Sequence, residues 1–587
     1  MSRATSAYLA AAQDLRDNAG QWQAYESTGN CVILGGPGSG KTKTITIKIA
    51  RLLEEQVHRP RRIACITYSN ACVDELRSRL STLGCDDDTR LQVSTVHSFC
   101  LMELVSPFAR IVGLDLPDPL QVASPQRVRE LFAETCRGIF GHAMNYQFNL
   151  ACEKLRRTVL KRESKEWNEW NVDETRTVVA YEALLAENGL IDFDGLVLAS
   201  VELVENHAWI RRAIRAKYPV IVIDEYQDLG LPLHRMVLAL LRAGVRIISV
   251  GDPDQSIFGF TGAKPRLLKS LANLRGVEAV SLSLNYRCGN RIIAASGSML
   301  ERPTTYRAHD DREGKVFIYK LKCDIHEQAR RTLERLVPEI LKRYPAWKPG
   351  DIAFLYRSKN EGAAIARAAD ELKLRYFRRD NGSPIKHSRL IDWLTDAAKW
   401  CAGGWKTGEV QLSRLLKNWR RLQSSLVREA DMLAARKDVI STLFSLRTAS
   451  MSLEHWLEAM YSNALDAMFK REPGLADDLD NLRELAVAAK KGGVLQDYTV
   501  EIFGNQGKSP EQINLITLHS AKGLEFEAVI MVGLEEGAFP DRRHRGDQLA
   551  EDRRLFYVGL TRAKNQVHLA FDSKESTLIT SVRGTIK

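Results

Sequence analysis

The sequence predicts an α/β protein with two lobes, each built on a parallel β-sheet and each interrupted by a mostly helical insertion. Three observations support this fold class. The chain of 587 residues is too long for one hydrophobic core, and such a length corresponds to about four domains of ~150 residues. Short runs rich in Val and Ile alternate with helical patterns, as buried parallel strands do. Two long, charge-rich helical regions lie between these runs.

The apolar runs give the expected strands in chain order. The first lobe is expected to contain the strands Cys31–Leu34, Ile63–Tyr68, Val220–Ile223 and Ile247–Val250. The second lobe is expected to contain the strands Val316–Leu321, Ile352–Tyr356, Ile513–Thr517 and Val529–Val532. Strands that alternate with helical patterns in this way are typical of layered α/β folds.

The two helical regions carry no clear strand pattern and are predicted to emerge from loops of the lobes. The first lobe is predicted to comprise residues 1–100 and 191–278, around an insertion of residues 101–190. The second lobe is predicted to comprise residues 279–403 and 506–587, around an insertion of residues 404–505. Gly504–Pro510, which contains two glycines and a proline, is predicted to be a linker. Basic residues beside tryptophans in both insertions suit nucleic-acid contact, and packing on the parent lobe explains them equally well.

A glycine-rich loop follows the first expected strand and precedes a helical pattern. It matches G-x-x-x-x-G-K-[ST] with the residues Gly35, Gly36, Pro37, Gly38, Ser39, Gly40, Lys41 and Thr42. Such a loop turns backbone N–H groups towards phosphate oxygens, and the following helix adds its positive end. Lys41 is expected to reach the β- and γ-phosphates of ATP, and the Thr42 hydroxyl to hold Mg²⁺. A flexible glycine-rich turn is the alternative.

An acidic pair ends the expected strand Val220–Ile223. Asp224 is placed towards the metal ion, and Glu225 is placed to polarise the water that attacks the terminal phosphate. An ordinary acidic strand end is the alternative, but the presence of the phosphate loop favours the catalytic interpretation.

Composition narrows the class of protein. The net charge of +11 and the pI near 9.1 favour a polyanionic partner, although basic surface also serves solubility. The ten cysteines form no C-x-x-C pair, so neither a zinc ribbon nor an iron–sulfur cluster is supported. The chain shows no signal peptide and no apolar stretch near the ~20 residues of a membrane span. A cytoplasmic location, with no membrane partner, is therefore expected.

From Asp224–Asp228 outward, the sequence resembles superfamily 1 helicases of the UvrD/Rep/PcrA type. The resemblance extends from Gln21 to Lys564 and follows the order of the family's motifs. Its further pieces are Gln21–Ala24, Thr67–Asn70, Ser94–Phe99, Asp192–Phe193, Val250–Phe260, Asn285–Arg287, Leu355–Arg357, Thr517–Phe526 and Val558–Ala563. Any one of these pieces would be weak evidence, whereas the ordered series is specific. The resemblance implies that both lobes are RecA-like.

The resemblance assigns roles around ATP. It implies that Gln21 reads the adenine, Tyr286 stacks on it and Glu525 meets the ribose. Gln255 is expected to sense the γ-phosphate. Arg287 and Arg562, both in the predicted second lobe, are expected to be arginine fingers, which are worth ~10³–10⁵ in rate.

The resemblance also implies a track for single-stranded DNA. Its expected contacts are Tyr68, Asn70, His97, Phe258, Phe260 and His519. Aromatic side chains can stack on any base and so permit movement without sequence preference. Core packing is the alternative for Phe258 and Phe260.

Several positions depart from the family pattern and mark a divergent member. Lys43, next to the nucleotide, replaces a usual arginine and cannot stack as a plane. Phe258 and Phe260 replace tyrosine and tryptophan, and Thr261 replaces arginine. Pro253 replaces a usual acid. These changes are expected to alter the detailed contacts with DNA and to leave ATP hydrolysis intact.

The expected function is ATP-dependent 3′-to-5′ movement on single-stranded DNA with unwinding at duplex junctions. A second interpretation is a DNA-stimulated translocase that powers a partner nuclease and unwinds weakly by itself. The compact layout is similar to the helicase subunit of Gabija-type anti-phage systems. A third interpretation is a nucleotide-dependent scaffold without hydrolysis, which the intact catalytic residues argue against.

Overall fold

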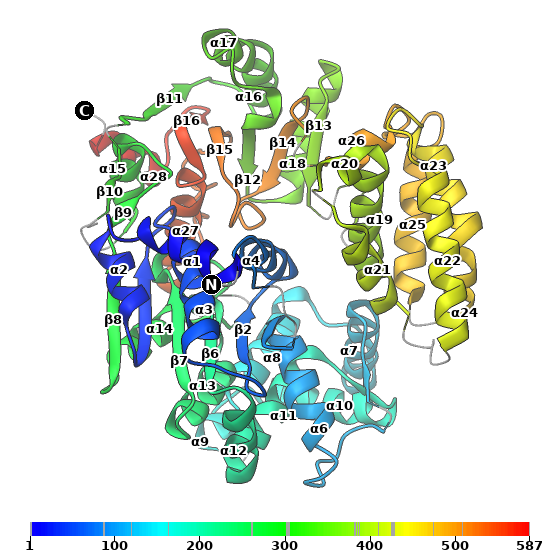
Figure 1. Cartoon of the computed structure of the whole chain (residues 1–587). Coiled ribbons are helices and arrows are strands. Elements are labelled where there is room, and N and C mark those ends of the chain that lie inside the picture. The colour runs from blue at the N-terminus through cyan, green and yellow to red at the C-terminus, as the bar shows by residue number, and fades with distance from the viewer. Residues whose placement is uncertain are drawn as a thin grey trace. The chain divides into compact units, whose positions relative to one another are not determined.

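The computed structural model describes residues 3–585 apart from 86–88, 119, 163, 260–261, 301–305, 311, 381–382, 384, 387, 409, 424–428, 473–474 and 507–508 (Figure 1). The chain divides into two compact units. Unit 1 comprises Met1–Val316, Pro540–Asn565 and Thr580–Lys587, and unit 2 comprises Phe317–Phe539 and Gln566–Ile579. Three stretches predicted for the second lobe cluster with unit 1, namely residues 279–316, 540–565 and 580–587. The lobe boundaries stay a prediction. In the described part of the chain, no helix is long and apolar enough to cross a membrane.

Unit 1 contains a six-stranded sheet in the order β3-β2-β6-β7-β1-β8, with every neighbouring pair parallel. Its strands are β1 (Asn30–Gly35), β2 (Ile63–Thr67), β3 (Leu91–Thr95), β6 (Val220–Ile223), β7 (Arg246–Gly251) and β8 (Val277–Leu282). The four predicted strands are confirmed. The two that the sequence pattern missed, β3 and β8, are the edge strands, which mix polar with apolar residues because only inner strands are covered along their whole length.

Alternate residues of the central strands face two separate hydrophobic cores. Val220 and Val222 pack into one core, with α3 (Lys41–Glu55) and α4 (Asn70–Thr82). Ile221 and Ile223 pack into the other, with α11 (Phe193–Asn206) and α13 (Leu231–Arg242). The sheet is therefore covered on both faces, which is why its inner strands are continuous apolar runs.

Residues 100–191 form the helical part of unit 1. Its helices are η1 (Cys100–Val105), α6 (Ser106–Phe108), α7 (Pro125–Phe140), α8 (Tyr146–Thr158), α9 (Lys165–Asn168) and α10 (Val172–Glu187). Asn and Ser side chains cap α7, α8 and α10 at their first turns. The sequence shows no clear strand pattern here, but the structure adds one short strand pair to the helices. A short strand, β4 (Gln121–Val122), pairs in parallel with β5 (Leu190–Ile191) at the C-terminal end of the region.

Unit 2 is built on a second six-stranded sheet in the order β11-β16-β15-β12-β14-β13. Its strands are β11 (Lys315–Lys320), β12 (Ile352–Tyr356), β13 (Tyr376–Arg379), β14 (Ile513–Thr517), β15 (Phe526–Met531) and β16 (Ala563–Phe571). All four predicted strands are present. β13 and β16 escaped the sequence pattern because β13 carries two arginines and β16 begins with polar residues. The helices α16 (Ile325–Arg331), α17 (Val337–Arg343) and α18 (Lys359–Glu371) accompany this sheet.

A helical part with its own core completes unit 2. It contains α19 (Arg389–Lys399), η7 (Trp400–Gly404), α20 (Trp405–Thr407), α21 (Leu412–Arg421), α22 (Glu429–Ser445), α23 (Leu453–Met460), η8 (Tyr461–Leu465), α24 (Asp466–Arg471), α25 (Ala476–Ala489) and α26 (Val500–Gly504). Gly504, predicted to start a linker, instead ends α26 and is buried. A Cβ added there would lie 2.4 Å from the Lys399 nitrogen. The glycine therefore permits a close approach of two helices, which a local pattern cannot distinguish from a turn.

The remaining elements connect or flank these parts. They are α1 (Arg3–Gln13), α2 (Ala19–Glu26), α5 (Val96–Phe99), α12 (Ala208–Lys217), η2 (Tyr226–Asp228), η3 (Pro253–Gln255), α14 (Pro265–Ala272), β9 (Leu284–Asn285), α15 (Asn290–Gly297), β10 (Arg307–Ala308), η5 (Thr332–Leu336), η6 (Pro349–Asp351), α27 (Asp547–Leu560) and α28 (Thr577–Thr585).

Candidate nucleotide site and nucleic-acid interface

The glycine-rich loop joins β1 to α3, as predicted. Gly38 and Gly40 have φ of 68° and 79°, a left-handed conformation that favours glycine. Neither position has room for a side chain. A Cβ on Gly40 would lie 2.3 Å from the Gln21 amide nitrogen, and one on Gly38 would lie 2.5 Å from the Arg287 Cβ. Ser39 closes the turn by donating from Oγ to the Gly36 carbonyl at 2.8 Å.

Lys41 lies buried at the floor of this loop. Its Nζ donates to the carbonyl oxygens of Gly35 at 2.8 Å and Gly36 at 3.0 Å. Burial lowers the pKa of Lys41, and the charges of Glu225, Asp252 and Asp224 oppose that shift. A cation thus stands between the phosphate loop and a group of buried carboxylates.

The predicted adenine-side residues meet the same loop. Gln21 is buried and donates from Nε2 to the Ser39 carbonyl at 2.9 Å. Asn18 caps α2 at Gln21 and donates from Nδ2 to the Tyr286 hydroxyl at 3.1 Å. Tyr286 donates its backbone N–H to the Gly38 carbonyl at 2.8 Å. Its ring stacks on His309 with 4.5 Å between centroids.

Lys43 occupies a different environment from the rest of the loop. Its Nζ pairs with Asp14 at 3.3 Å, and both side chains are well exposed. Exposed pairs of this kind contribute little to stability, about 0–1 kcal/mol.

The acidic pair follows β6 in a strained turn. Glu225 has φ of +53°, although it is not a glycine, and such a conformation costs about 1–3 kcal/mol. Burial, and then the neighbouring Glu225 charge, raise the pKa of Asp224 to about 7. Burial and the Glu225 charge outweigh the opposing charge of Lys41, so this carboxylate suits a further cation. The Thr42 hydroxyl at the start of α3 is an oxygen ligand of the kind that Mg²⁺ accepts. These residues fit the expected metal ion.

Gln227, which the sequence interpretation did not single out, bridges the acidic pair to the next strand end. Its Nε2 donates to the Glu225 carboxylate, and its Oε1 accepts the Asp252 N–H at 3.0 Å. Its backbone carbonyl accepts the Ser256 hydroxyl at 3.0 Å. A Cβ on Gly251 would lie 2.3 Å from the Gln227 Oε1, so this bridge needs a glycine beside it. The bridge depends on tertiary contact and had no signal in the local pattern.

Gln255 and the predicted arginine fingers converge on this bridge within unit 1. Gln255 donates to the Asp252 carboxylate at 2.7 Å and accepts from the Arg562 guanidinium at 3.3 Å. Burial, and then the charge of Arg287, lower the pKa of Arg562 to about 9. Arg287 donates to the Thr561 carbonyl at 3.4 Å. Two cations therefore stand next to the carboxylate cluster, where they could neutralise phosphate charge.

Glu525 and His519 lie in unit 2, in the segment after β14. Glu525 is exposed and His519 is half-buried, and burial lowers the pKa of His519. Their roles at ATP and at DNA stay predictions.

Two aromatic pairs in unit 1 involve residues that follow the ends of β2 and β3. Tyr68 and Phe258 stack with 5.8 Å between ring centroids, and both are half-buried. His97 packs on Phe193 at 4.9 Å. Phe193 keeps 46% of its surface exposed, so it is a candidate base contact that the sequence interpretation named only as a landmark.

The other predicted DNA contacts of unit 1 are Asn70 and Phe260. Asn70 is exposed at the first position of α4, directly after the Ser69 cap. Phe260 and the neighbouring Thr261 lie outside the described residues.

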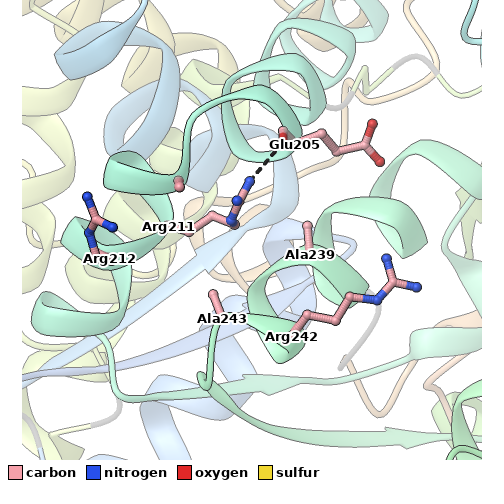
Figure 2. A pocket seen from close by; sticks show the side chains of 7 residues that line it. Glu205, Arg211, Arg212, Ala239, Arg242 and Ala243 are labelled. Carbon is pink, nitrogen blue, oxygen red and sulfur yellow. Dashed lines mark hydrogen bonds between the residues drawn. The ribbon is translucent and has the colours of Figure 1, made fainter.

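A cleft elsewhere in unit 1 contains none of the predicted residues. It is lined by Glu205, Ala208, Arg211, Arg212, Ala239, Arg242 and Ala243. Arg211 turns back to donate to the Glu205 carbonyl, whereas Figure 2 shows Arg212 and Arg242 pointing away from each other. The side chains of Arg211, Arg212 and Arg242 do not converge on one point in this structure.

The fold and the site together define a P-loop nucleotide-binding protein with two RecA-like parallel sheets. Two family profiles match the chain. "UvrD/REP helicase N-terminal domain" matches residues 17–274, and "UvrD-like helicase C-terminal domain" matches residues 443–574. The chain belongs to the UvrD/Rep family of superfamily 1 helicases, and it is a helicase enzyme.

Curated relatives match the chain almost from end to end. The protein named "ATP-dependent DNA helicase Rep" from Escherichia coli strain K12 is 26% identical, over 94% of this chain and 90% of its own length. "DNA helicase II" of the same strain is 26% identical, over 92% and 82%. "ATP-dependent DNA helicase PcrA" from Staphylococcus epidermidis is 24% identical, over 94% and 83%.

Proposed function

We propose that this protein is an ATP-dependent DNA helicase that moves 3′-to-5′ on single-stranded DNA and unwinds duplex at a junction. The observation that carries the proposal is the segment Asp252–Phe258. At one end, Asp252 and Gln255 join the carboxylate and arginine network of the nucleotide site. At the other end, Phe258 stacks on Tyr68. One short segment thus links phosphate chemistry to a base-stacking surface.

In the proposed reaction, Lys41 and the loop N–H groups bind the phosphates of ATP. Thr42 and Asp224 would hold Mg²⁺, and the bound ion would supply positive charge for the phosphate oxygens. Glu225, positioned by Gln227, accepts a proton from the attacking water. Arg287 and Arg562 stabilise the charge that develops on the transferred phosphoryl group.

Movement of the protein along DNA requires that its affinity for the strand changes with the bound nucleotide. We propose that Gln255 senses the γ-phosphate and that Tyr68, His97, Phe193 and Phe258 contact bases or line their path. The 3′-to-5′ direction rests on the family resemblance, and the DNA substrate agrees with the names of the relatives, which are DNA helicases.

A strand-displacement assay tests the proposal. The purified protein, ATP and Mg²⁺ are given duplexes with a 3′ overhang, a 5′ overhang or blunt ends. Unwinding of the 3′-overhang duplex by the wild type, and its loss in Lys41→Ala, is the expected result. Preferred unwinding of the 5′-overhang duplex would contradict the direction.

An assay without a duplex separates the alternative. If the protein displaces streptavidin from the end of a biotinylated single strand but unwinds no duplex, it is a translocase. A role with a partner nuclease would then be the better proposal.

A further inference from the structure

Helix α27 contacts the Asp252–Phe258 segment and its continuation at two points. The Glu551 carboxylate accepts the N–H of Gly259 at 3.0 Å, directly after Phe258. Arg554 donates from Nε to the Ser256 carbonyl at 2.7 Å, two residues before Phe258. Residues 551 and 554 lie one turn apart on the same face of a helix. The helix therefore holds the backbone on both sides of the aromatic residue.

The contact at Gly259 depends on close approach. A Cβ at this position would lie 2.6 Å from the Glu551 Oε2, so any side chain here would force the carboxylate to shift from its present position. Burial raises the pKa of Glu551, and the Gly259 N–H and the charge of Arg554 oppose that shift. Placing a carboxylate in this half-buried position costs desolvation free energy, which the Gly259 N–H and the nearby positive charge of Arg554 offset.

The same helix leads to an arginine finger. Arg562 follows the end of α27 and donates from Nε to the Val558 carbonyl at 3.0 Å. Its other end reaches Gln255 at 3.3 Å. The segment is thus connected to α27 and its extension at Gln255, Ser256 and Gly259, so that a shift of the finger region on nucleotide binding would carry the segment with it.

From this geometry we infer that Glu551 is a positioning residue that couples α27, which leads to Arg562, to the Asp252–Phe258 segment. This inference rests on the proposed function. Glu551 touches neither the phosphate loop nor the carboxylate cluster in any contact described above. Replacing Glu551 is therefore expected to change how DNA stimulates the ATPase and how the nucleotide changes the affinity for DNA. The rate of ATP hydrolysis without DNA should not change.

The test compares Glu551→Ala with Glu551→Gln in the full chain. DNA-free ATPase, DNA-stimulated ATPase and the affinity for a fluorescent oligo-dT are measured, the last with ADP and with a non-hydrolysable ATP analogue. In Glu551→Ala, the stimulation and the ratio of the two affinities should each fall by about ten-fold, within the usual range of coupling between sites. DNA-free turnover should stay within about two-fold of wild type, because no contact at the phosphates is lost.

Glu551→Gln separates the hydrogen bond from the charge. The glutamine amide oxygen can still accept the Gly259 N–H, so this variant should retain most of the coupling. Asp547→Asn, an exposed acid in the first turn of α27, is the matched control and should behave as wild type. Gly259→Ala should reproduce the loss of stimulation, because its Cβ displaces the carboxylate.

Three outcomes overturn the inference. If Glu551→Ala keeps the DNA stimulation and the affinity ratio of the wild type, the contact with Gly259 does not couple the nucleotide to DNA. An equal fall of DNA-free and DNA-stimulated turnover would indicate a general structural role. Equal loss in Glu551→Gln and Glu551→Ala would exclude the hydrogen bond as the cause. If the wild-type protein itself shows no stimulation by DNA, the proposed function fails first, so the two failures are distinguishable.

Discussion

At the scale of single residues, the site combines burial with charges of both signs. Lys41, Asp224 and Arg562 are all buried, and their pKa values are shifted in the direction that burial imposes on each charged form. Glu225 adds a left-handed backbone. Such a concentration of costly features is typical of a site that binds a charged ligand and is stabilised by it.

Lys41→Ala and Glu225→Gln are expected to abolish turnover in different ways. Lys41 meets phosphate charge in the ground state, so Lys41→Ala should weaken ATP binding. Glu225 acts on the water, so Glu225→Gln should bind ATP but lower kcat by at least ~10²-fold. Binding of a fluorescent ATP analogue and phosphate release measure the two effects. Arg79→Ala, an exposed residue of α4, is the control. Near-normal turnover in either variant would refute the assignment.

Arg562→Ala is expected to lower DNA-stimulated kcat by ~10³-fold or more, the range found for arginine fingers. Arg562→Lys should recover little, because one ammonium cannot present the separate planar donors that reach both the Gln255 side chain and the Val558 carbonyl. Arg287→Ala should behave similarly. Single-strand affinity at fixed salt is measured beside the ATPase rate. Lost DNA binding with intact turnover would show that the arginines serve the strand instead.

At the scale of elements, short contacts between helices decide how the helical parts are held. In unit 1, Arg156 of α8 makes a two-point ion pair with Asp192, the cap of α11, at 2.6 and 3.1 Å. Tyr181 of α10 donates to the same carboxylate at 3.0 Å. In unit 2, α26 and α19 meet at Gly504. Both contacts join segments that are distant in the sequence.

Arg156→Ala is expected to cost about 3–5 kcal/mol of unfolding free energy at pH 7, because Asp192 would stay buried without its cation. Burial alone would raise the pKa of Asp192, but Arg156 and the hydrogen bonds hold it below its usual value. A lowered pKa stabilises the fold above the unfolded value of ~3.9, and this contribution is lost as the pH falls through the folded value. The difference in unfolding free energy between Arg156→Ala and the wild type should therefore become smaller below about pH 4. Urea unfolding at pH 7 and below about pH 4 measures this difference in unfolding free energy. The same difference at both pH values would exclude the ion pair as the cause.

Gly504→Ala is expected to destabilise unit 2 by about 1–3 kcal/mol, because the new Cβ would meet backbone atoms of Lys399 that cannot move independently. Gly138→Ala in α7 is the control. A Cβ there meets nothing within 4 Å, so alanine should stabilise the helix by about 0.5–1 kcal/mol. Thermal unfolding of both variants gives the comparison, and equal midpoints would contradict the contact.

At the scale of the whole molecule, two kinds of contact are expected to contribute together to the affinity for DNA. The net charge of +11 favours phosphate contacts that weaken with salt. The aromatic pair Tyr68 and Phe258 offers stacking, which does not depend on salt in this way.

Phe258→Ala should weaken single-strand affinity by roughly ten-fold, since stacking on an aromatic side chain is worth about 1–3 kcal/mol per base. The slope of log affinity against log salt should stay that of wild type, because no phosphate contact is lost. Titrations of oligo-dT at several salt concentrations measure both quantities. An unchanged affinity would mean that Phe258 is a packing residue. A flatter slope would mean that the variant disturbs phosphate contacts.

The sequence by itself determined the local features of this protein. The phosphate loop, the acidic strand end and eight strands were predicted, because a glycine-rich turn after an apolar run and a run buried on both faces are short-range patterns. The motif order also identified the family. Tertiary structure decided the rest. Gln227 lies within the acidic motif, but its link to Asp252, like the contacts of Gly504 and Glu551, comes from strand ends and helices remote in sequence. Hydrogen bonds and close approaches of that kind depend on how the elements pack, and periodicity records only which face of an element is buried.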